Sequence, residues 1–261
     1  MKVLEKILES VQKRVEFEKK RCHVSSFDES QAGTRSLKES LLGNPQISVI
    51  AELKKASPSE GLIRRDFNPP KLAESFERGG VKGISVLTEP EYFKGNIKHI
   101  GKVRKKVDVP VLRKDFILDE YQLYQTAHYG ADAVLLITEI LGKELKEFIK
   151  ISKDLGLEPL VEVREKKHAE IAMEYGADLV GINNRNLKTM RISFKRTEKI
   201  ARYLPDDTVV VSESGVDNSG DILTLREYGV DAVLVGTSIM KSNDVEDKVR
   251  ELSEVSPIDR N

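Results

Sequence analysis

The chain has 261 residues, with 43 lysines and arginines against 43 aspartates and glutamates, so no net charge favours nucleic acid or a membrane surface as a partner. A single cysteine excludes an intrachain disulfide and a thiolate metal site, and the four histidines are too scattered to predict any metal. No segment approaches the ~20 apolar residues of a membrane helix, and the N-terminus has no apolar signal core, which predicts a cytoplasmic protein.

The first 46 residues precede any predicted strand, and we expect them to form an N-terminal helical extension. Residues 2–20 carry apolar side chains at helical spacing, which predicts an amphipathic helix. Residues 36–42 predict a second short helix, because Gly43-Asn44-Pro45 follows as a stop signal. Both helices are expected to cover the bottom or the rim of the main domain.

The run from residue 47 to residue 53 is apolar and β-branched, which predicts a buried strand. Its end carries Glu52 and Lys54, and residues two apart on a strand point to the same side. A loop with Ser57 and Pro58 ends the strand, since proline cannot continue a ladder. Buried ions are costly unless they are paired or used, so this strand end indicates either an active-site edge or an ordinary salt bridge.

Four similar segments recur about every 50 residues, and each predicts a helix end, a glycine cap and a strand. They begin at Gly80, Tyr129, Tyr175 and Tyr228. A second set of strands is predicted at residues 47–53, 109–113, 158–163 and 208–212. Helical patterns separate the strands, at residues 70–78, 97–105, 119–128, 143–155, 165–175, 194–203, 218–228 and 245–254.

This alternation predicts an α/β fold, a closed (β/α)8 TIM barrel that forms a single domain over residues 1–261, with residues 1–46 as its extension. An open, doubly wound sheet is the alternative. It would leave two edge strands, and no predicted strand has the charged or short character that protects an edge.

In such barrels the active site lies at the C-terminal ends of the strands. Ionisable or hydrogen-bonding side chains gather at the predicted ends, at Glu52, Lys54, Lys114, Glu162, Asn183, Glu213 and Ser214. If Lys54 converges on Lys114, it lowers the pKa of Lys114, which suits a general acid. Glu162 is interpreted as a proton acceptor or as the counter-ion of a lysine. Asn183 and Ser214 would orient a hydroxyl without adding charge.

The seventh and eighth strand ends carry a second pattern, Ser214-Gly215 and Gly236-Thr237-Ser238. In this architecture phosphate commonly binds after these two strands, where glycine lets backbone amides approach and a helix N-terminus adds its dipole. The pattern therefore predicts a phosphate site, with plain strand-to-helix turns as the alternative.

Six strand-end motifs, in order along nearly the whole chain, resemble the indole-3-glycerol-phosphate synthase family of tryptophan biosynthesis. They are Glu52-x-Lys54-x-x-Ser57-Pro58-Ser59, Leu112-Arg113-Lys114-Asp115-Phe116, Leu160-Val161-Glu162-Val163, Gly181-Ile182-Asn183-x-Arg185-x-Leu187, Ser212-Glu213-Ser214-Gly215 and Val235-Gly236-Thr237-Ser238. The N-terminal extension fits the family as well, whereas Thr138-Glu139 is more polar than its pattern.

The resemblance implies a carboxy-lyase that closes the pyrrole ring of 1-(2-carboxyphenylamino)-1-deoxyribulose 5-phosphate. The products would be indole-3-glycerol phosphate, carbon dioxide and water, with no cofactor. The expected partner is this phosphorylated small molecule, and the expected state is a monomer or a weak dimer.

The resemblance also implies a role for each candidate residue. Lys114 would be the general acid that activates the substrate carbonyl, and Lys54 would bind the substrate carboxylate or act as a second acid. Glu162 would accept a proton or stabilise positive charge, while Glu52, Asn183, Glu213 and Ser214 would hold hydroxyls and lysines. The expected substrate contacts are Ser57, Pro58, Phe93, Phe116, Arg185, Gly215, Gly236, Thr237 and Ser238.

Three alternatives stand beside this interpretation. A Schiff-base aldolase would use Lys114 as a nucleophile. A sister phosphate-binding isomerase of the same pathway is disfavoured by two lysines and three glutamates in one barrel mouth. A non-catalytic sugar-phosphate binding protein has no need for so many ionisable groups.

Overall fold

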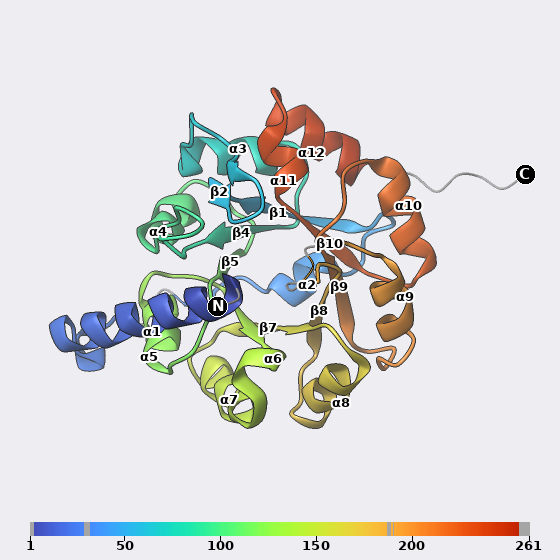
Figure 1. Ribbon diagram of the computed structural model, residues 1–261. Coiled ribbons are helices and arrows are strands. Elements are labelled where there is room, and N and C mark those ends of the chain that lie inside the picture. Colours follow the sequence, from blue (N-terminus) through green and yellow to red (C-terminus); the bar gives the residue numbers. More distant parts are fainter. Residues whose placement is uncertain (1–2, 29–31, 187–188, 190, 256–261) are drawn as a thin grey trace, which may run out of the picture.

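In the part of the chain that the computed structural model describes, residues 3–28, 32–186, 189 and 191–255, eight parallel strands form a closed barrel (Figure 1). Closure follows because β1 (Ser48–Leu53) pairs with β10 (Ala232–Val235) on one side and with β4 (Gly83–Leu87) on the other. The remaining barrel strands are β5 (Val111–Lys114), β6 (Ala133–Ile137), β7 (Glu158–Val163), β8 (Leu179–Asn183) and β9 (Val209–Glu213). The predicted (β/α)8 fold is confirmed, and the open sheet is excluded.

Helices surround the barrel and follow the strands in turn (Figure 1). Several begin at a side-chain cap, as where Asn218 and Asp221 form a capping box. The helices of the layer around the barrel are α3 (Pro69–Arg78), α4 (Lys98–Arg104), α5 (Tyr121–His128), α7 (Leu145–Asp154), α8 (Lys166–Glu174), α9 (Lys195–Ala201), α10 (Ser219–Glu227) and α12 (Val245–Ser253). These bounds lie close to the predicted ones.

Some short pieces of structure lie outside the predicted strands and helices. The loop after β1 folds into a hairpin of β2 (Ala56–Ser57) and β3 (Gly61–Leu62). A short helix, α6 (Thr138–Leu141), precedes η2 (Gly142–Glu144), because Gly142 adopts a positive φ of 53° and ends the first turn. A further short helix, α11 (Thr237–Lys241), follows the last strand.

Side chains alternate along each strand between the barrel interior and the helix layer. Ile50, Leu112 and Leu160 belong to the cluster that fills the interior. The residues two positions further along the same strands are Glu52, Lys114 and Glu162. The hydrophobic interior therefore ends, toward the C-terminal ends of the strands, in a layer of ionisable groups.

The N-terminal extension covers both ends of the barrel. The short helix α2 (Leu37–Leu41) packs Leu37 and Leu41 against the barrel interior, and its cap residue Ser36 donates a hydrogen bond to Glu158 at the start of β7, 2.6 Å away. The long helix α1 (Val3–Arg21) lies at the opposite end and beside α5, while η1 (Val24–Ser26) follows it (Figure 1). The two helices of the extension were predicted to cover the bottom or the rim of the barrel. In the structure, α2 covers the bottom and α1 lies at the rim of the opposite end. Position 2 of the predicted first helix and Leu187 of the sixth-strand motif lie outside the described residues.

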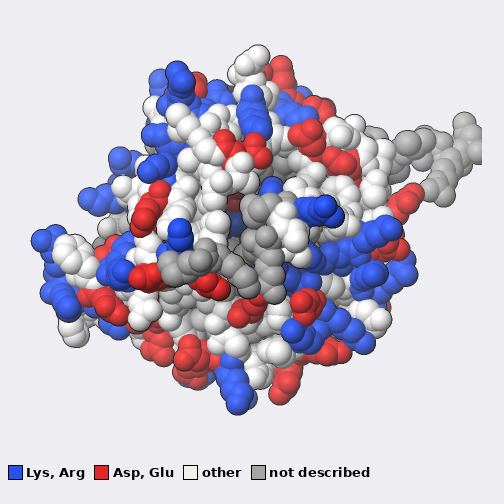
Figure 2. Space-filling model, in the orientation of Figure 1, with Lys and Arg blue, Asp and Glu red and all other residues white. Residues whose placement is uncertain are grey.

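On the face shown in Figure 2, basic and acidic side chains are interspersed, in agreement with the balanced charge of the sequence. Over the described ranges, no helix combines the length and the apolar character that crossing a membrane requires.

Candidate active site

A cavity of about 400 Å³ lies at the C-terminal ends of the strands. It brings together every site residue that the sequence predicted, although these residues come from most of the barrel strands and their loops. They are Glu52, Lys54, Ser57, Pro58, Phe93, Lys114, Phe116, Glu162, Asn183, Arg185, Glu213, Ser214, Gly215, Gly236, Thr237 and Ser238. Their individual roles stay predictions.

Two lysines at the base of the cavity are ion-paired with two different carboxylates. Lys54 Nζ lies 2.7 Å from Glu52 Oε1, on the same strand end, as the two-residue spacing predicted. Lys114, at the end of β5, donates to Glu213 at the end of β9, across the barrel. Both carboxylates are buried, so each pair is a short-range contact in a poorly solvated place.

The environment of Lys114 differs from the one expected. Burial lowers the pKa of Lys114, but the attraction of Glu213, Glu52 and Glu162 outweighs burial and raises it well above its usual value. The expected lowering by Lys54 is therefore wrong, because carboxylates from three strands face this ammonium group. Lys114 remains protonated at neutral pH.

The carboxylates respond in opposite directions. Burial raises the pKa of Glu213 to about 7, and the charges of Glu162 and Glu52 act in the same direction, against the lowering effect of Lys114. Burial also raises the pKa of Glu52, but Lys54 and Lys114 outweigh it and hold this pKa below the ordinary value. Of the two carboxylates, Glu213 is thus the one whose charge changes near neutral pH.

Glu162 takes an arginine as its partner. Arg164 Nη2 donates to Glu162 Oε1 at 2.7 Å, and Arg164 Nη1 donates to Glu139 Oε2 at 2.8 Å. The ion pair of Glu162 is thus with an arginine, while its charge also acts on the Lys114 ammonium. Burial lowers the pKa of Arg164, but Glu162 and Glu139 outweigh it and raise the pKa overall.

Two glycines leave room for these carboxylates. A Cβ atom at Gly181 would lie 2.2 Å from Glu213 Oε1, and one at Gly236 would lie 2.4 Å from Glu52 Oε1 and 2.9 Å from Lys54 Nζ. Such distances are far below van der Waals contact, so any side chain at either position displaces an ion pair.

The turns after β9 and β10 lie side by side at the cavity. Ser214 and Gly215 both have positive φ, at 68° and 110°, which is uncommon for a serine and marks a tight turn. Ser238 Oγ, in α11, donates to the carbonyl of Val216 at 3.0 Å and joins the two turns. The helix α11 begins at Thr237, directly after the second of these turns.

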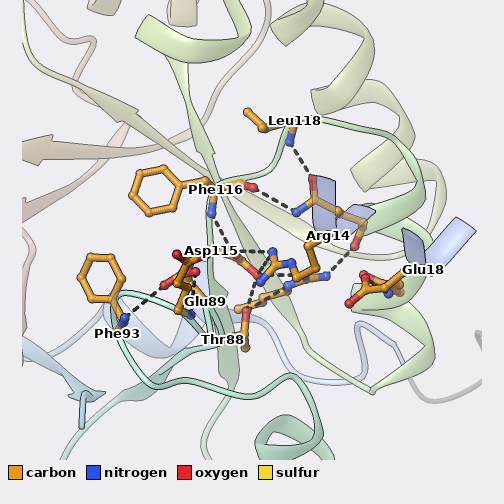
Figure 3. Close-up of polar contacts among 12 residues, drawn as sticks. Arg14, Glu18, Thr88, Glu89, Phe93, Asp115, Phe116 and Leu118 are labelled. Carbon is orange, nitrogen blue, oxygen red and sulfur yellow. Dashed lines mark hydrogen bonds and ion pairs between the residues drawn. The ribbon is translucent and has the colours of Figure 1, made fainter. Parts of the chain in front are cut away.

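Aromatic and aliphatic side chains form the opposite wall. The rings of Phe93 and Phe116 lie 6.2 Å apart between centroids, and Leu4 and Ile7 of α1 join them at the cavity. The Glu89 carboxylate accepts hydrogen bonds from the backbone amides of Tyr92 and Phe93, which fixes the loop that carries Phe93 (Figure 3).

A buried ionic network holds α1 beside this wall (Figure 3). Arg14 of α1 donates to both oxygens of Asp115, at 3.1 and 3.0 Å, and Arg113 donates to the same carboxylate at 3.0 Å. Thr88 adds a hydrogen bond to it at 2.7 Å. Burial raises the pKa of Asp115, but Arg113 and Arg14 outweigh it and lower the pKa overall. Asp115 directly follows Lys114, so this network also fixes the end of β5.

The sequence analysis missed several residues at the cavity. Arg164 follows Glu162 at the two-residue spacing that singled out Glu52 and Lys54, so the same reasoning could have found it. No sequence pattern marked Lys241 or the side chains of α1 as cavity residues, because only the folding of the chain brings them to the cavity. Lys241 pairs with Glu60 there, at 2.6 Å. Among the described residues, no group of three or more His, Cys, Asp or Glu side chains is arranged to hold a metal ion.

The fold and the cavity define a class of protein, a TIM-barrel enzyme with paired acids and bases at its strand ends and glycine-containing turns after its last two strands. The barrel itself is shared widely. The 3-hexulose-6-phosphate synthase of Salmonella typhimurium superposes with a TM-score of 0.65 at 18% identity, covering 80% of this chain and 98% of that chain. Thiamine phosphate pyrophosphorylase from Pyrococcus furiosus gives a TM-score of 0.61 at 18% identity, over 79% of this chain and 93% of that one. These two likenesses concern the fold alone.

Sequence comparison identifies the family. The family model described as indole-3-glycerol phosphate synthase matches residues 4–252. A relative of that name in Thermoanaerobacter pseudethanolicus is 45% identical over 248 residues, which is 95% of each chain. Another in Methanopyrus kandleri is 44% identical over 256 residues, which is 96% of this chain and 98% of the relative.

The chain belongs to the indole-3-glycerol phosphate synthase family. The resemblance drawn from the strand-end motifs is thereby confirmed, together with the class of enzyme that it implied, a carboxy-lyase of tryptophan biosynthesis.

Proposed function

We propose that this chain closes the pyrrole ring of 1-(2-carboxyphenylamino)-1-deoxyribulose 5-phosphate, with Lys114 as the general acid. The observation that carries this proposal is the position of Lys114, an ammonium group at the base of the cavity that is paired with Glu213 and faces Glu52 and Glu162. The ammonium is protonated and so has a proton to donate to a carbonyl oxygen as the aromatic ring attacks the carbonyl carbon, although its raised pKa makes it a weaker acid than the sequence predicted.

The other groups divide the remaining work. Loss of carbon dioxide restores the aromatic ring after attack, and loss of the new hydroxyl as water completes the pyrrole. Lys54, with Glu52 as its partner at 2.7 Å, binds the departing carboxylate or protonates the departing hydroxyl. Glu162 accepts the proton released at the nitrogen or stabilises the positive charge that develops there.

The two ends of the substrate match the two sides of the cavity. The apolar side with Phe93, Phe116 and Leu4 suits the anthranilate ring. The turns of Gly215 and Gly236, with the start of α11, suit the phosphate. Asn183 and Ser214 also line the cavity and suit the sugar hydroxyls.

The Schiff-base alternative is disfavoured by the same lysine. A nucleophilic amine must be neutral, and the carboxylates around Lys114 raise its pKa instead of lowering it. The positive charge of the Lys114 ammonium prevents nucleophilic attack, whereas the proton that it carries is the one needed for acid catalysis.

The test supplies the purified chain with the anthranilate-linked ribulose phosphate and follows indole fluorescence. Fluorescence should appear in wild type, and borohydride added with the substrate should leave no covalent adduct on Lys114. A wild-type protein that produces no indole contradicts the proposed reaction. A borohydride-trapped adduct on Lys114 moves this lysine from acid to nucleophile.

A further inference from the structure

Arg164 is a nearly buried cation at the cavity that the proposed mechanism does not use. Its side chain is 10% exposed, and its guanidinium bridges Glu162, which is 3% exposed, and Glu139, which is 42% exposed. Glu139 belongs to the Thr138-Glu139 pair that departs from the family pattern.

The bridge joins two neighbouring strands. Glu162 lies at the end of β7, and Glu139 lies in α6, directly after β6. The strands pair with Ile137 opposite Glu162, so the two carboxylates lie above adjacent strand ends. A guanidinium is planar and presents its N–H groups in a fixed fork, so the bond to Glu139 also fixes the nitrogen that holds Glu162.

No lysine of the site could replace Arg164 in this contact. Lys54 is paired with Glu52, and Lys114 is paired with Glu213, so each ammonium already has a carboxylate. Arg196, another arginine in this region, donates to the backbone carbonyl of Asn183 at 2.7 Å instead. In the described part of the chain, Arg164 is the residue that donates to Oε1 of Glu162.

We propose that Arg164, braced by Glu139, is a positioning residue that holds the Glu162 carboxylate with one oxygen fixed and the other directed to the substrate. The inference rests on the proposed function, because Arg164 acts through Glu162 and contributes no contact of its own to the reacting atoms. A carboxylate without this brace would rotate among several orientations. Misplacement by about 1 Å is enough to cost ~10²-fold in rate.

The experiment measures kcat and KM for ring closure in Arg164→Gln, Arg164→Lys and Glu139→Gln, each alone and with Glu162→Gln. Arg164→Gln should lower kcat about 10- to 100-fold and change KM less than about threefold. Arg164→Lys should recover part of the rate, because one ammonium restores the charge but not the fork. Glu139→Gln should lower kcat about threefold, since its amide oxygen still accepts a hydrogen bond.

The decisive comparison is the double variant. If Arg164 acts through Glu162, Arg164→Gln should cause no further loss of kcat in the Glu162→Gln protein. Arg202→Gln, which breaks an exposed pair with Glu198 on α9, is the matched control and should leave both kinetic constants unchanged.

Several results would overturn the inference. Additive losses in the double variant would mean that Arg164 acts on the substrate itself, and a raised KM with unchanged kcat would mean the same. Wild-type kcat in Arg164→Gln would make the bridge purely structural. If Arg164→Gln does not fold, the Arg164→Lys and Glu139→Gln variants decide by the same criteria. An inactive wild type would instead contradict the proposed function, so the two failures are distinguishable.

Discussion

Lys114 is the single residue on which the proposed chemistry depends most. Lys114→Ala should fold normally but lose at least ~10²–10⁴-fold in kcat, the usual contribution of general acid catalysis. The check is steady-state indole fluorescence beside a thermal unfolding curve. A variant that keeps more than about a tenth of the wild-type kcat would remove Lys114 from the acid role.

Glu213 is the residue that should link stability to pH. Its pKa is raised from 4.5 to about 7, so between these values the folded protein holds a proton that the unfolded chain has released. The contribution of Glu213 to the free energy of unfolding is therefore present below pH 4.5 and is lost as the pH rises toward 7.

Glu213→Gln should consequently flatten the fall in stability across that window. Urea unfolding of wild type and variant at a series of pH values measures it. An equally steep fall in the variant would assign the titration to another group.

Gly236 lies beside an ion pair as well as in the turn proposed to bind phosphate. Because an added Cβ would lie 2.4 Å from Glu52 Oε1, Gly236→Val should displace the Glu52–Lys54 pair as well as crowd the turn. We expect a rise in KM for the phosphorylated substrate and a fall in kcat of about tenfold or more. Gly101→Ala, where the new Cβ would meet its nearest atom at 3.5 Å, is the matched control. An effect on KM alone would show that the ion pair tolerates the change.

The sequence could predict which residues belong to the site, because the alternation of side chains along a strand depends only on near neighbours in the chain. Residues two apart on a strand share a side, and the barrel brings all strand ends together. Partners across the barrel could not be predicted in this way. That Lys114 would find Glu213, or that carboxylates from three strands would raise its pKa, depends on distances that chain spacing does not contain.

At the level of elements, α1 is the piece whose attachment can be tested directly. Arg14 joins α1 to the buried Asp115 through two hydrogen bonds, and α1 contributes Leu4 and Ile7 to the cavity wall. Arg14→Ala should lower the free energy of unfolding by about 1.5–3 kcal/mol, the usual loss for hydrogen bonds to a charged group. It should also raise KM several-fold, because the wall loses its support.

Lys13→Ala on the same helix is the control for this prediction. Lys13 pairs with Glu9 on the exposed side of α1, and removing it should change neither stability nor KM measurably. Equal effects of both variants would mean that Arg14 stabilises the helix α1 itself and does not attach it to the barrel.

Elements with strong periodicity were predicted to within a few residues, and the short ones were not. The hairpin of β2 and β3 has two residues in each strand, too few to show an alternating pattern. The helix predicted at residues 143–155 begins instead at Leu145, after the separate turns of α6 and η2. A positive φ at Gly142 separates them, and the sequence gives no measure of that angle.

At the scale of the whole molecule, the two ends of the barrel should divide stability from function. Asp132, fully buried just before β6, accepts hydrogen bonds from the Val111 amide at 2.9 Å and from Arg104 at 2.6 Å. It lies at the end of the barrel opposite to the cavity. Asp132→Ala should therefore lower the free energy of unfolding by about 3 kcal/mol or more, through loss of a buried charge partner.

The same variant should keep the wild-type kcat and KM at a temperature where it is folded. Denaturant unfolding and steady-state kinetics measure the two properties separately. Asp154→Ala, which breaks an exposed pair with Lys150, is the control and should change neither. A large fall in kcat for Asp132→Ala would show that the two ends of the barrel are coupled.

The pairing of β1 with β10 also sets a condition on biosynthesis. Ser48 finds its partner at Ala232, so the strand that leaves the ribosome first must wait for the last one. Until then, the nascent chain holds a partial sheet with two uncovered edges, which are templates for pairing with other chains. Because such distant pairing is slow, these edges stay open to aggregation for longer than in a fold built from local contacts.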